Sequence, residues 1–114
     1  MNKYKFKVMC QCPVDEKFIF YDVIIEAPEI VTFLVETVHK FQEEILNTKL
    51  MQEDLLTTFC VYVNDNTDSV FRYSDDQELP NVKVIMEGVH GGILITSECF
   101  FTERANRLFS DGTL

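Results

Sequence analysis

Apolar residues recur every three or four positions along residues 28–46, the spacing that places side chains on one face of an α-helix. The face consists of Ile30, Phe33, Leu34, Val38, Phe41 and Ile45. Pro28 suits the first helical position because its missing N–H would have no partner there, and Glu29 suits the positive end of the helix dipole. The pattern predicts one long helix that needs a sheet to cover its apolar face.

Two strands are predicted before this helix. Residues 3–12 alternate between polar and apolar, which is typical of a half-buried strand. The inward positions are Tyr4, Phe6, Val8, Cys10 and Cys12. Residues 13–16 favour a turn, so residues 17–26 are expected to return as the second strand of an antiparallel hairpin. Phe18, Phe20 and Ile24 fall on its outer side, where a bulge or a covering tail hides them or they form an exposed patch.

Three further strands are predicted after the helix, at residues 57–64, 69–73 and 82–87. Leu50, Met51, Leu55 and Leu56 form a short apolar connection, and residues 74–81 read as an exposed loop. Beyond Gly91 and Gly92, residues 93–96 resemble a strand. Residues 97–109 have the apolar spacing of a closing helix, with Glu98 in its first turn.

The chain has 114 residues, which suits one domain, here residues 1–92 with residues 93–114 packed on it as an extension. Its net charge of −9 and its lack of a Lys and Arg cluster argue against a nucleic acid partner, so other proteins are the expected partners. Residues 1–7 alternate instead of forming an apolar signal, and no stretch is long enough to cross a membrane. A cytoplasmic or nuclear location is expected, with the cysteines as thiols.

The order of these elements resembles the ubiquitin-like superfamily. Residues 82–92 resemble the last strand and His-Gly-Gly ending of the ubiquitin-related modifier family, and Val61 to Asp65 is similar to the strand and turn before it. Lys5 to Val8 and Ala27 to Glu29 resemble the ubiquitin-fold modifier family. The resemblance implies an α+β fold of the β-grasp type, in which a mixed sheet wraps one long helix, here with an extra C-terminal strand and a short helix.

Two interpretations of Gly91 and Gly92 remain open. The resemblance implies a terminal carboxylate on Gly92 that an activating enzyme adenylates, for conjugation or for sulfur transfer. Because residues 93–114 follow, that carboxylate exists only after cleavage. The alternative is a hairpin turn between two strands, a role that Gly-Gly fills readily.

Catalytic and metal-binding patterns are weak. Cys10 and Cys12 read as small core residues, and the chain lacks the Cys and His spacing of a zinc site. His39 lies on the polar side of the long helix. The acidic residues Asp65, Asp68, Asp75, Asp76 and Glu78 lack the spacing of a calcium loop and suggest a solvated edge or a docking surface for a basic partner. No phosphate loop or nucleophile elbow is present, which disfavours an enzyme.

These patterns lead to one functional hypothesis and two alternatives. The hypothesis is a small ubiquitin-like protein that binds other proteins through Phe18, Phe20 and Ile24, or through the acidic edge at Asp75 and Asp76, without a cofactor, metal, membrane or nucleic acid. The first alternative is a protein modifier or sulfur carrier activated at Gly92. The second is a small thiol-dependent enzyme or redox protein that uses Cys60, Cys99 and His90.

Overall fold

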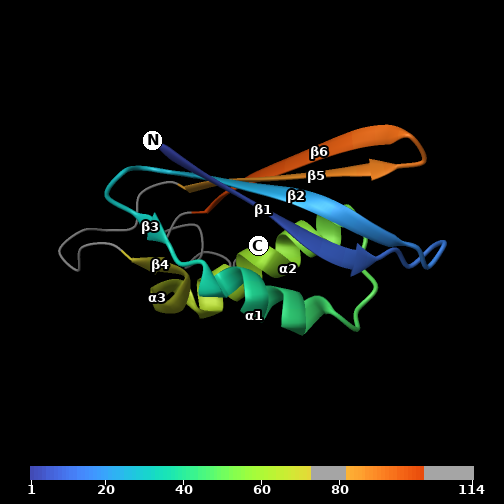
Figure 1. The fold of residues 1–114 in the computed structure, drawn as a ribbon, viewed down its shortest axis with the longest axis horizontal. Helices are drawn as coiled ribbons and strands as arrows, with labels where there is room; N and C mark the ends of the chain where they lie inside the picture. The colour runs from blue at the N-terminus through green and yellow to red at the C-terminus, as the bar shows by residue number, and fades with distance from the viewer. Residues whose placement is uncertain (73–81, 102–114) are drawn as a thin grey trace, which may run out of the picture.

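The computed structural model describes residues 1–72 and 82–101. A sheet covers two main helices, and a pair of short strands lies at one side (Figure 1). In chain order the elements are β1 (Asn2–Gln11), β2 (Phe18–Ala27), β3 (Thr32–Phe33), α1 (Glu36–Ile45), α2 (Gln52–Asp65), α3 (Thr67–Val70), β4 (Phe71–Arg72), β5 (Val82–His90) and β6 (Ile93–Phe101). The predicted α+β class is confirmed.

The first hairpin forms as predicted. β1 and β2 pair antiparallel from Asn2 opposite Ala27 to Gln11 opposite Phe18, in one uninterrupted register. A bulge is therefore absent from this hairpin, and the prediction of one is wrong. Because the alternation persists to the end of β2, Phe18 and Phe20 are exposed, at 51% and 65%, and Ile24 is half-buried. The alternative of an exposed apolar patch is the one that the structure contains.

The second hairpin joins β5 to β6 through Gly91 and Gly92. Both glycines have positive φ, 58° and 83°, the left-handed region that glycine enters without a side-chain clash. The hairpin-turn interpretation of these residues is confirmed. The helix predicted from residue 97 is wrong over residues 97–101, which continue β6 in pairing with β5. The rest of that predicted helix lies outside the described residues.

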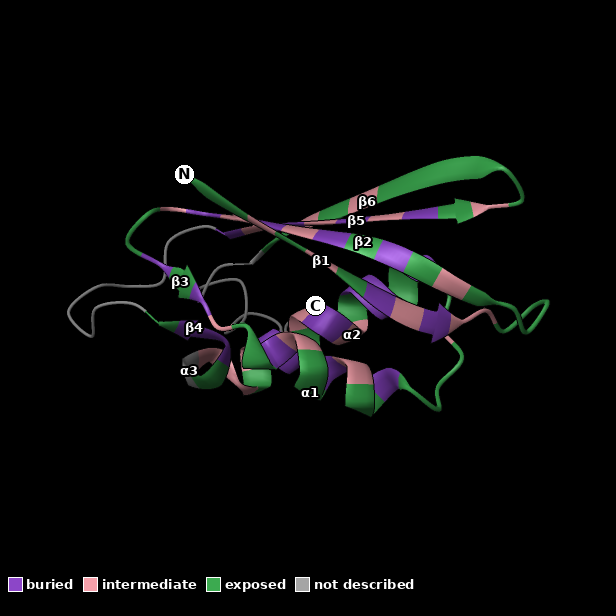
Figure 2. Cartoon of the chain, viewed as in Figure 1, coloured by how far each residue is buried: buried purple, intermediate pink, exposed green. Residues whose placement is uncertain are grey.

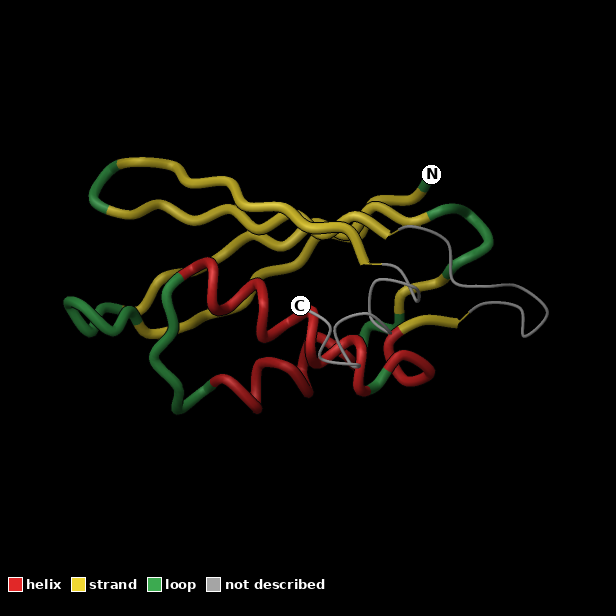
Figure 3. Tube along the Cα trace, turned by 180° about the vertical axis from the view of Figure 1, so that it is seen from behind, coloured by secondary structure: helices red, strands yellow, loops and turns green. Residues whose placement is uncertain are grey.

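The sheet has the order β1-β2-β5-β6, and each neighbouring pair is antiparallel. Seen from behind, α1 and α2 lie on the same side of this sheet (Figure 3). The expected mixed sheet around one long helix is not confirmed, because the sheet is antiparallel and two helices cover it. The predicted fifth strand is confirmed and extends to His90.

The predicted long helix is shorter than expected. α1 starts at Glu36, because residues before it make other backbone hydrogen bonds: Val31 donates to Pro28 at 2.9 Å, and β3 pairs with β4. Phe33, Phe41 and Ile45 are buried as predicted, and His39 is exposed as predicted. Ile30 is 56% exposed, so its assignment to the buried face is wrong.

The strand predicted at residues 57–64 is wrong, since these residues belong to α2. Helical spacing explains the burial of Leu55, Leu56, Phe59, Tyr62 and Val63. Val61, placed on the same face as Phe59 by the alternating interpretation, is 52% exposed. Aromatic and β-branched residues in this segment favour strand locally, and the packing of α2 under the sheet overrides that preference.

The strand predicted at residues 69–73 is correct only in part. α3 ends at Val70, and Phe71 and Arg72 form β4, which pairs with Thr32 and Phe33 of β3. The loop predicted at residues 74–81 lies outside the described residues. So do Asp75, Asp76 and Glu78 of the predicted acidic edge.

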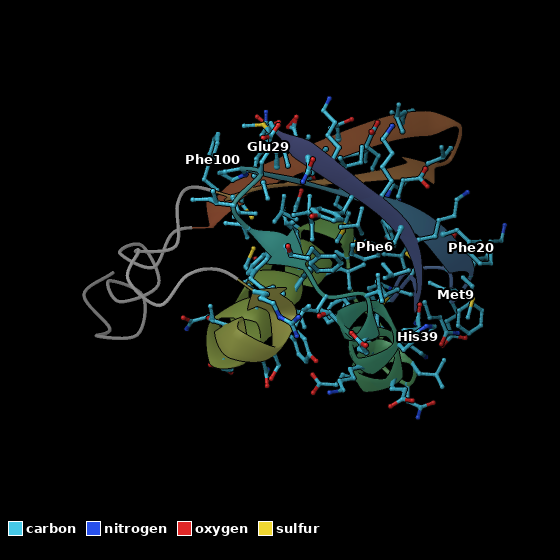
Figure 4. The ribbon with its side chains drawn as sticks, turned by 60° about the vertical axis from the view of Figure 1, so that its left-hand side comes forward. Phe6, Met9, Phe20, Glu29, His39 and Phe100 are labelled. Atoms are coloured by element: carbon cyan, nitrogen blue, oxygen red, sulfur yellow. The ribbon has the colours of Figure 1, made fainter. Side chains whose placement is uncertain are left out.

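The core lies between the sheet and the helices (Figure 2). Aromatic rings fill much of it: Phe41 packs edge-on against Phe59 at 5.0 Å, and Phe6 stacks on Phe33 at 5.5 Å. In Figure 4, Phe6 lies between the sheet and the helices. Among the described residues, no helix combines the length and the apolar content needed to cross a membrane.

Candidate active site

Three chain segments lie at the same end of the molecule, which we call the hairpin end, and the two hairpins diverge there. They are the loop between β1 and β2, the turn between β5 and β6, and the start of α2, all to the right in Figure 1. The side chains with reactive or strongly polar groups in this region are Cys12, Asp15, Tyr21, Gln52 and His90. Their arrangement makes the hairpin end the candidate active site.

Backbone hydrogen bonds fix Cys12 at the base of the first hairpin loop. Its N–H donates to the Lys17 carbonyl at 2.8 Å, and its carbonyl accepts from the Glu16 N–H at 3.0 Å. Glu16 has a φ of 62°, which lets the short loop reverse direction. Cys12 is half-buried, in contrast to the fully buried Cys10, so the prediction that both are core residues holds for Cys10 alone.

Asp15 lies beside the Cys12 thiol. Its Oδ1 accepts the backbone N–H of Lys17 at 3.1 Å. This hydrogen bond, together with a weaker one from the Cys12 side chain, lowers the pKa of Asp15, although partial desolvation opposes the shift. The Asp15 carboxylate is therefore close enough to interact with the Cys12 side chain.

The segment between α1 and α2 ties this loop to the start of α2. The Leu50 N–H donates to the Gln11 carbonyl at 3.1 Å, and the Lys49 ammonium contacts the Glu16 carboxylate at 2.6 Å. This ion pair lowers the pKa of Glu16. Since Leu50 bonds the residue before Cys12 and lies two positions before Gln52, the thiol and the first residue of α2 are held in one region.

Gln52 is a polar side chain inside the structure, 4% exposed. Its Nε2 lies 3.0 Å from the Met86 carbonyl, 3.0 Å from the Ile95 carbonyl and 3.1 Å from the Ser97 hydroxyl. Its Oε1 lies 2.8 Å from His90 Nε2. Because an amide oxygen can only accept, this contact assigns the proton to Nε2 of His90 and leaves Nδ1 of the neutral ring as an acceptor.

Tyr21 packs beside the Gln52 and His90 pair. A Cβ on Gly88 would lie 2.6 Å from Tyr21 Cε1, so glycine is required for this close packing. The Tyr21 ring also lies 5.7 Å from the His90 ring. Burial raises the pKa of Tyr21 to about 12, and charge on Cys10 and Cys12 adds to the shift. Tyr21 is therefore neutral near pH 7 and within electrostatic reach of the Cys12 sulfur.

Among the predicted site residues, the structure brings together Cys60 of α2 and Cys99 of β6, whose sulfurs lie 2.8 Å apart. His90 does not join them. Cys99 pairs with Val84, six positions along β5 from His90, which places the two about 20 Å apart at roughly 3.3 Å per residue. The hypothesis of one thiol site built from Cys60, Cys99 and His90 is therefore wrong.

The predicted protein-binding residues lie elsewhere, on the open face of the sheet. Phe20 is opposite Met9 in the register, and Figure 4 shows the two at the same margin of the molecule. A hollow on this face has a mixed charged lining that consists of Lys5, Phe6, Lys7, Asp22, Ile24 and Glu87. Whether these residues bind a protein stays a prediction.

Sequence reasoning did not find the roles of Asp15, Tyr21 and Gln52. A cysteine followed three residues later by aspartate, inside a turn, was a usable signal for the thiol and its carboxylate. Gln52 had no such signal, because its partners are backbone carbonyls and a histidine at least 34 residues away in the sequence.

Comparison with known proteins relates the chain to others by structure and not by sequence. No protein-family model matches the chain, and no curated protein sequence matches it. The structure is similar to a solved one whose title is "Crystal structure of the archaeosine synthase QueF-Like in the apo form". The TM-score is 0.65, with 17% identical residues, over 87% of this chain and 90% of that one. A likeness at this identity establishes a shared fold.

This likeness corrects the family and the function expected from the sequence. The resemblance to ubiquitin-like proteins is wrong, because the fold is that of a QueF-like synthase, with an antiparallel sheet over two helices. The functional hypotheses that rested on it, a ubiquitin-like binding protein and a modifier or sulfur carrier activated at Gly92, are wrong as well. Gly92 lies in a hairpin turn whose following residues continue the sheet.

Proposed function

We propose that this chain is an enzyme of nucleoside modification, connected with the modification of tRNA, and that Cys12 is its reactive residue. The observation that carries the proposal is the structural match to an archaeosine synthase along nearly the whole of both chains. Archaeosine is a modified nucleoside of tRNA, so the matching enzyme acts in that chemistry. The hairpin end supplies groups suited to the same kind of reaction.

The proposed reactive step is attack by the Cys12 sulfur on an electrophilic carbon of a purine-type base. A thiolate is the nucleophilic form of cysteine, and it is most effective when partly accessible and held by a neighbouring group. Cys12 suits this role, since it is half-buried and the Asp15 carboxylate lies near its side chain. In this step the thiol proton passes to solvent and the sulfur forms a bond to the carbon, while the carbon–nitrogen π bond of the base breaks and its nitrogen takes up a proton.

The remaining residues of the hairpin end suit the recognition of a flat heterocycle. The half-buried His90 provides a ring on which a base can stack, and the buried Tyr21 ring lies 5.7 Å from it. His90 Nδ1 is an acceptor for an N–H on the edge of a base, because Gln52 holds the proton on Nε2. The net charge of −9 disfavours a phosphate backbone, so a free base or a nucleoside is the proposed substrate.

The test uses 6-chloropurine, a purine that reacts with thiolates by losing chloride. The full chain is incubated with a limiting amount of this compound at neutral pH, and the modified cysteine is identified by mass spectrometry of tryptic peptides. We expect one purinyl group on Cys12. Cys10 is in the same peptide, residues 8–17, so fragmentation of that peptide assigns the site.

Two variants and a second compound control this experiment. Cys12→Ser should abolish labelling, and Asp15→Asn should slow it by about tenfold or more, in line with the loss of a group that orients a nucleophile. The pyrimidine analogue 2-chloropyrimidine should react much less selectively among the four cysteines. Equal labelling of Cys12 by both compounds, or a preference of the purine for Cys60 or Cys99, would contradict the proposal.

A further inference from the structure

Cys60 and Cys99 form a close thiol pair away from the hairpin end. Cys60 is on α2 and Cys99 is on the edge strand β6, 39 positions apart in the sequence, and their sulfurs lie 2.8 Å apart. A disulfide bond is about 2.05 Å long, so the sulfurs are within a small movement of bonding distance. The two residues therefore meet the main geometric requirement for a cross-link.

The surroundings of the pair favour reaction between its two members. Both side chains are half-buried at the margin of the core. The hydrogen bond between the two sulfurs lowers the pKa of Cys99, and the same bond together with burial raises the pKa of Cys60. Cys99 is thus the member of the pair that loses its proton more readily. Within the described part of the chain, no group of three or more His, Cys, Asp or Glu residues is placed so that it could hold a metal ion.

We propose that Cys60 and Cys99 are a site of reversible disulfide formation that ties α2 to β6. The oxidant is a small-molecule disulfide such as oxidised glutathione. The Cys99 thiolate attacks one sulfur of this molecule, forms a mixed disulfide and releases the first thiolate. The Cys60 sulfur then loses its proton, attacks Cys99 Sγ and displaces the second thiolate, so that one disulfide is reduced to two thiols while the protein gains one disulfide.

The cross-link would act on the contact that also supports the hairpin end. Near its start, α2 bonds to β6 through Gln52, which contacts the Ile95 carbonyl and the Ser97 hydroxyl. Cys60 lies eight positions further along the same helix, and Cys99 two positions beyond Ser97. The disulfide would therefore fix a second point of the same helix and strand. This inference does not depend on the proposed enzymatic function.

The experiment compares the full chain in reduced and in oxidised glutathione. We expect oxidation to remove two hydrogens from Cys60 and Cys99 together and to leave no glutathione on either of them, whatever the state of Cys12. A tryptic digest made without reductant should contain one cross-linked species that joins residues 50–72 to residues 84–104. Because the bond closes a loop of 39 positions, the melting temperature should rise on the order of 10 °C on oxidation.

Matched variants assign the effect to this pair. Cys60→Ser and Cys99→Ser should each remove both the cross-linked peptide and the rise in melting temperature, while Cys12→Ser should keep both. The peptide map of the wild-type chain gives an answer even where a variant folds poorly. Stable glutathione adducts on Cys60 or Cys99, a disulfide between other cysteines, or an unchanged melting temperature on oxidation would overturn the proposal.

Discussion

At the residue scale, a few side chains pack at the point where the two hairpins of this fold separate. The pairing of β2 with β5 stops at Asp22 opposite Glu87, and from that point each hairpin continues alone. Tyr21 packs on Gly88 at this point. Nearby, the Gln52 side-chain amide donates hydrogen bonds to the Met86 and Ile95 carbonyls. A buried carbonyl without a partner costs about 1 to 3 kcal/mol, so this one amide supports the shape of the hairpin end.

The raised pKa of Tyr21 predicts a loss of stability at high pH. The folded chain keeps the Tyr21 proton up to about pH 12, whereas the unfolded chain releases it near pH 10.0. The contribution is complete below pH 10 and is lost as the pH rises towards 12, because the unfolded state then binds fewer protons. Two pKa units correspond to about 2 to 3 kcal/mol.

Urea unfolding between pH 8 and pH 12 measures this effect. Burial also raises the pKa of Tyr62, so the relevant quantity is the difference between the wild type and Tyr21→Phe. We expect the free energy of unfolding of the wild type to fall more steeply than that of the variant above pH 10. Parallel curves would show that Tyr21 titrates normally.

At the scale of elements, Phe33 tests how the short strand β3 contributes to the core. Its ring is 4% exposed and contacts Tyr4 at 5.6 Å, Phe6 at 5.5 Å and Phe71 at 6.0 Å. We expect Phe33→Ala to reduce the free energy of unfolding by about 3 to 5 kcal/mol, because it removes a ring and leaves a cavity.

Denaturation by urea gives this value, and Ile30→Ala is the matched control from the same segment. Since Ile30 is 56% exposed, its truncation should cost about 0.5 kcal/mol or less. A loss under 1 kcal/mol for Phe33→Ala would mean that β3 does not close the core at this point.

Strands were predicted well from the sequence where polar and apolar residues alternated regularly. Helices were predicted poorly where the same residues fitted both the helical spacing and the alternating spacing of a strand. β1 and β5 alternate between polar and apolar residues, whereas β2 has apolar residues on both faces. In all three strands the face expected to point inward is the more buried one. α2 was missed because its residues around Phe59, Val61 and Val63 also fit an alternating pattern. The segment before α1 has helical spacing, yet its backbone pairs with β4, a contact between residues 32–33 and 71–72 that no local pattern reveals.

The candidate site was less predictable than the fold. From the sequence, Cys12 was considered only as a core residue. Its proposed role as a reactive residue depends on the neighbouring carboxylate and on contacts with residues 48–50. Pairing of Cys60 with Cys99 depends on α2 lying against β6, and α2 was predicted to be a strand. A site built from distant segments can be predicted only when the topology of the fold is known. The ubiquitin-like interpretation gave the wrong topology, so these sites could not be found from it.

For the molecule as a whole, the two edges of the sheet and its open face predict self-association. β1 and β6 are the outer strands, and within the described ranges neither pairs with a further strand on its outer side. Phe18 and Phe20 are exposed on the open face, and Ile93, Leu94 and Phe100 are exposed along β6. Exposed apolar residues along the edge strand β6 and on the open face favour contact with another chain.

Sedimentation at several protein concentrations tests this expectation. We expect the wild type to gain mass with concentration, and a Phe20→Ser and Leu94→Ser double variant to remain closer to the monomer. The Val14→Ser variant, which changes an exposed apolar residue in the hairpin loop, serves as the control. A monomeric wild type at all concentrations would contradict the prediction.

The most direct test of the central claim, that the hairpin end binds a purine-type compound, is a nuclear magnetic resonance titration of the labelled chain with guanosine. We expect the backbone amide signals of Cys12, Asp15, Gln52 and His90 to shift together, with those of α3 and β4 unchanged. Cytidine, as the control, should shift them far less. Shifts confined to other parts of the chain, or none at saturating guanosine, would contradict the assignment of the active site.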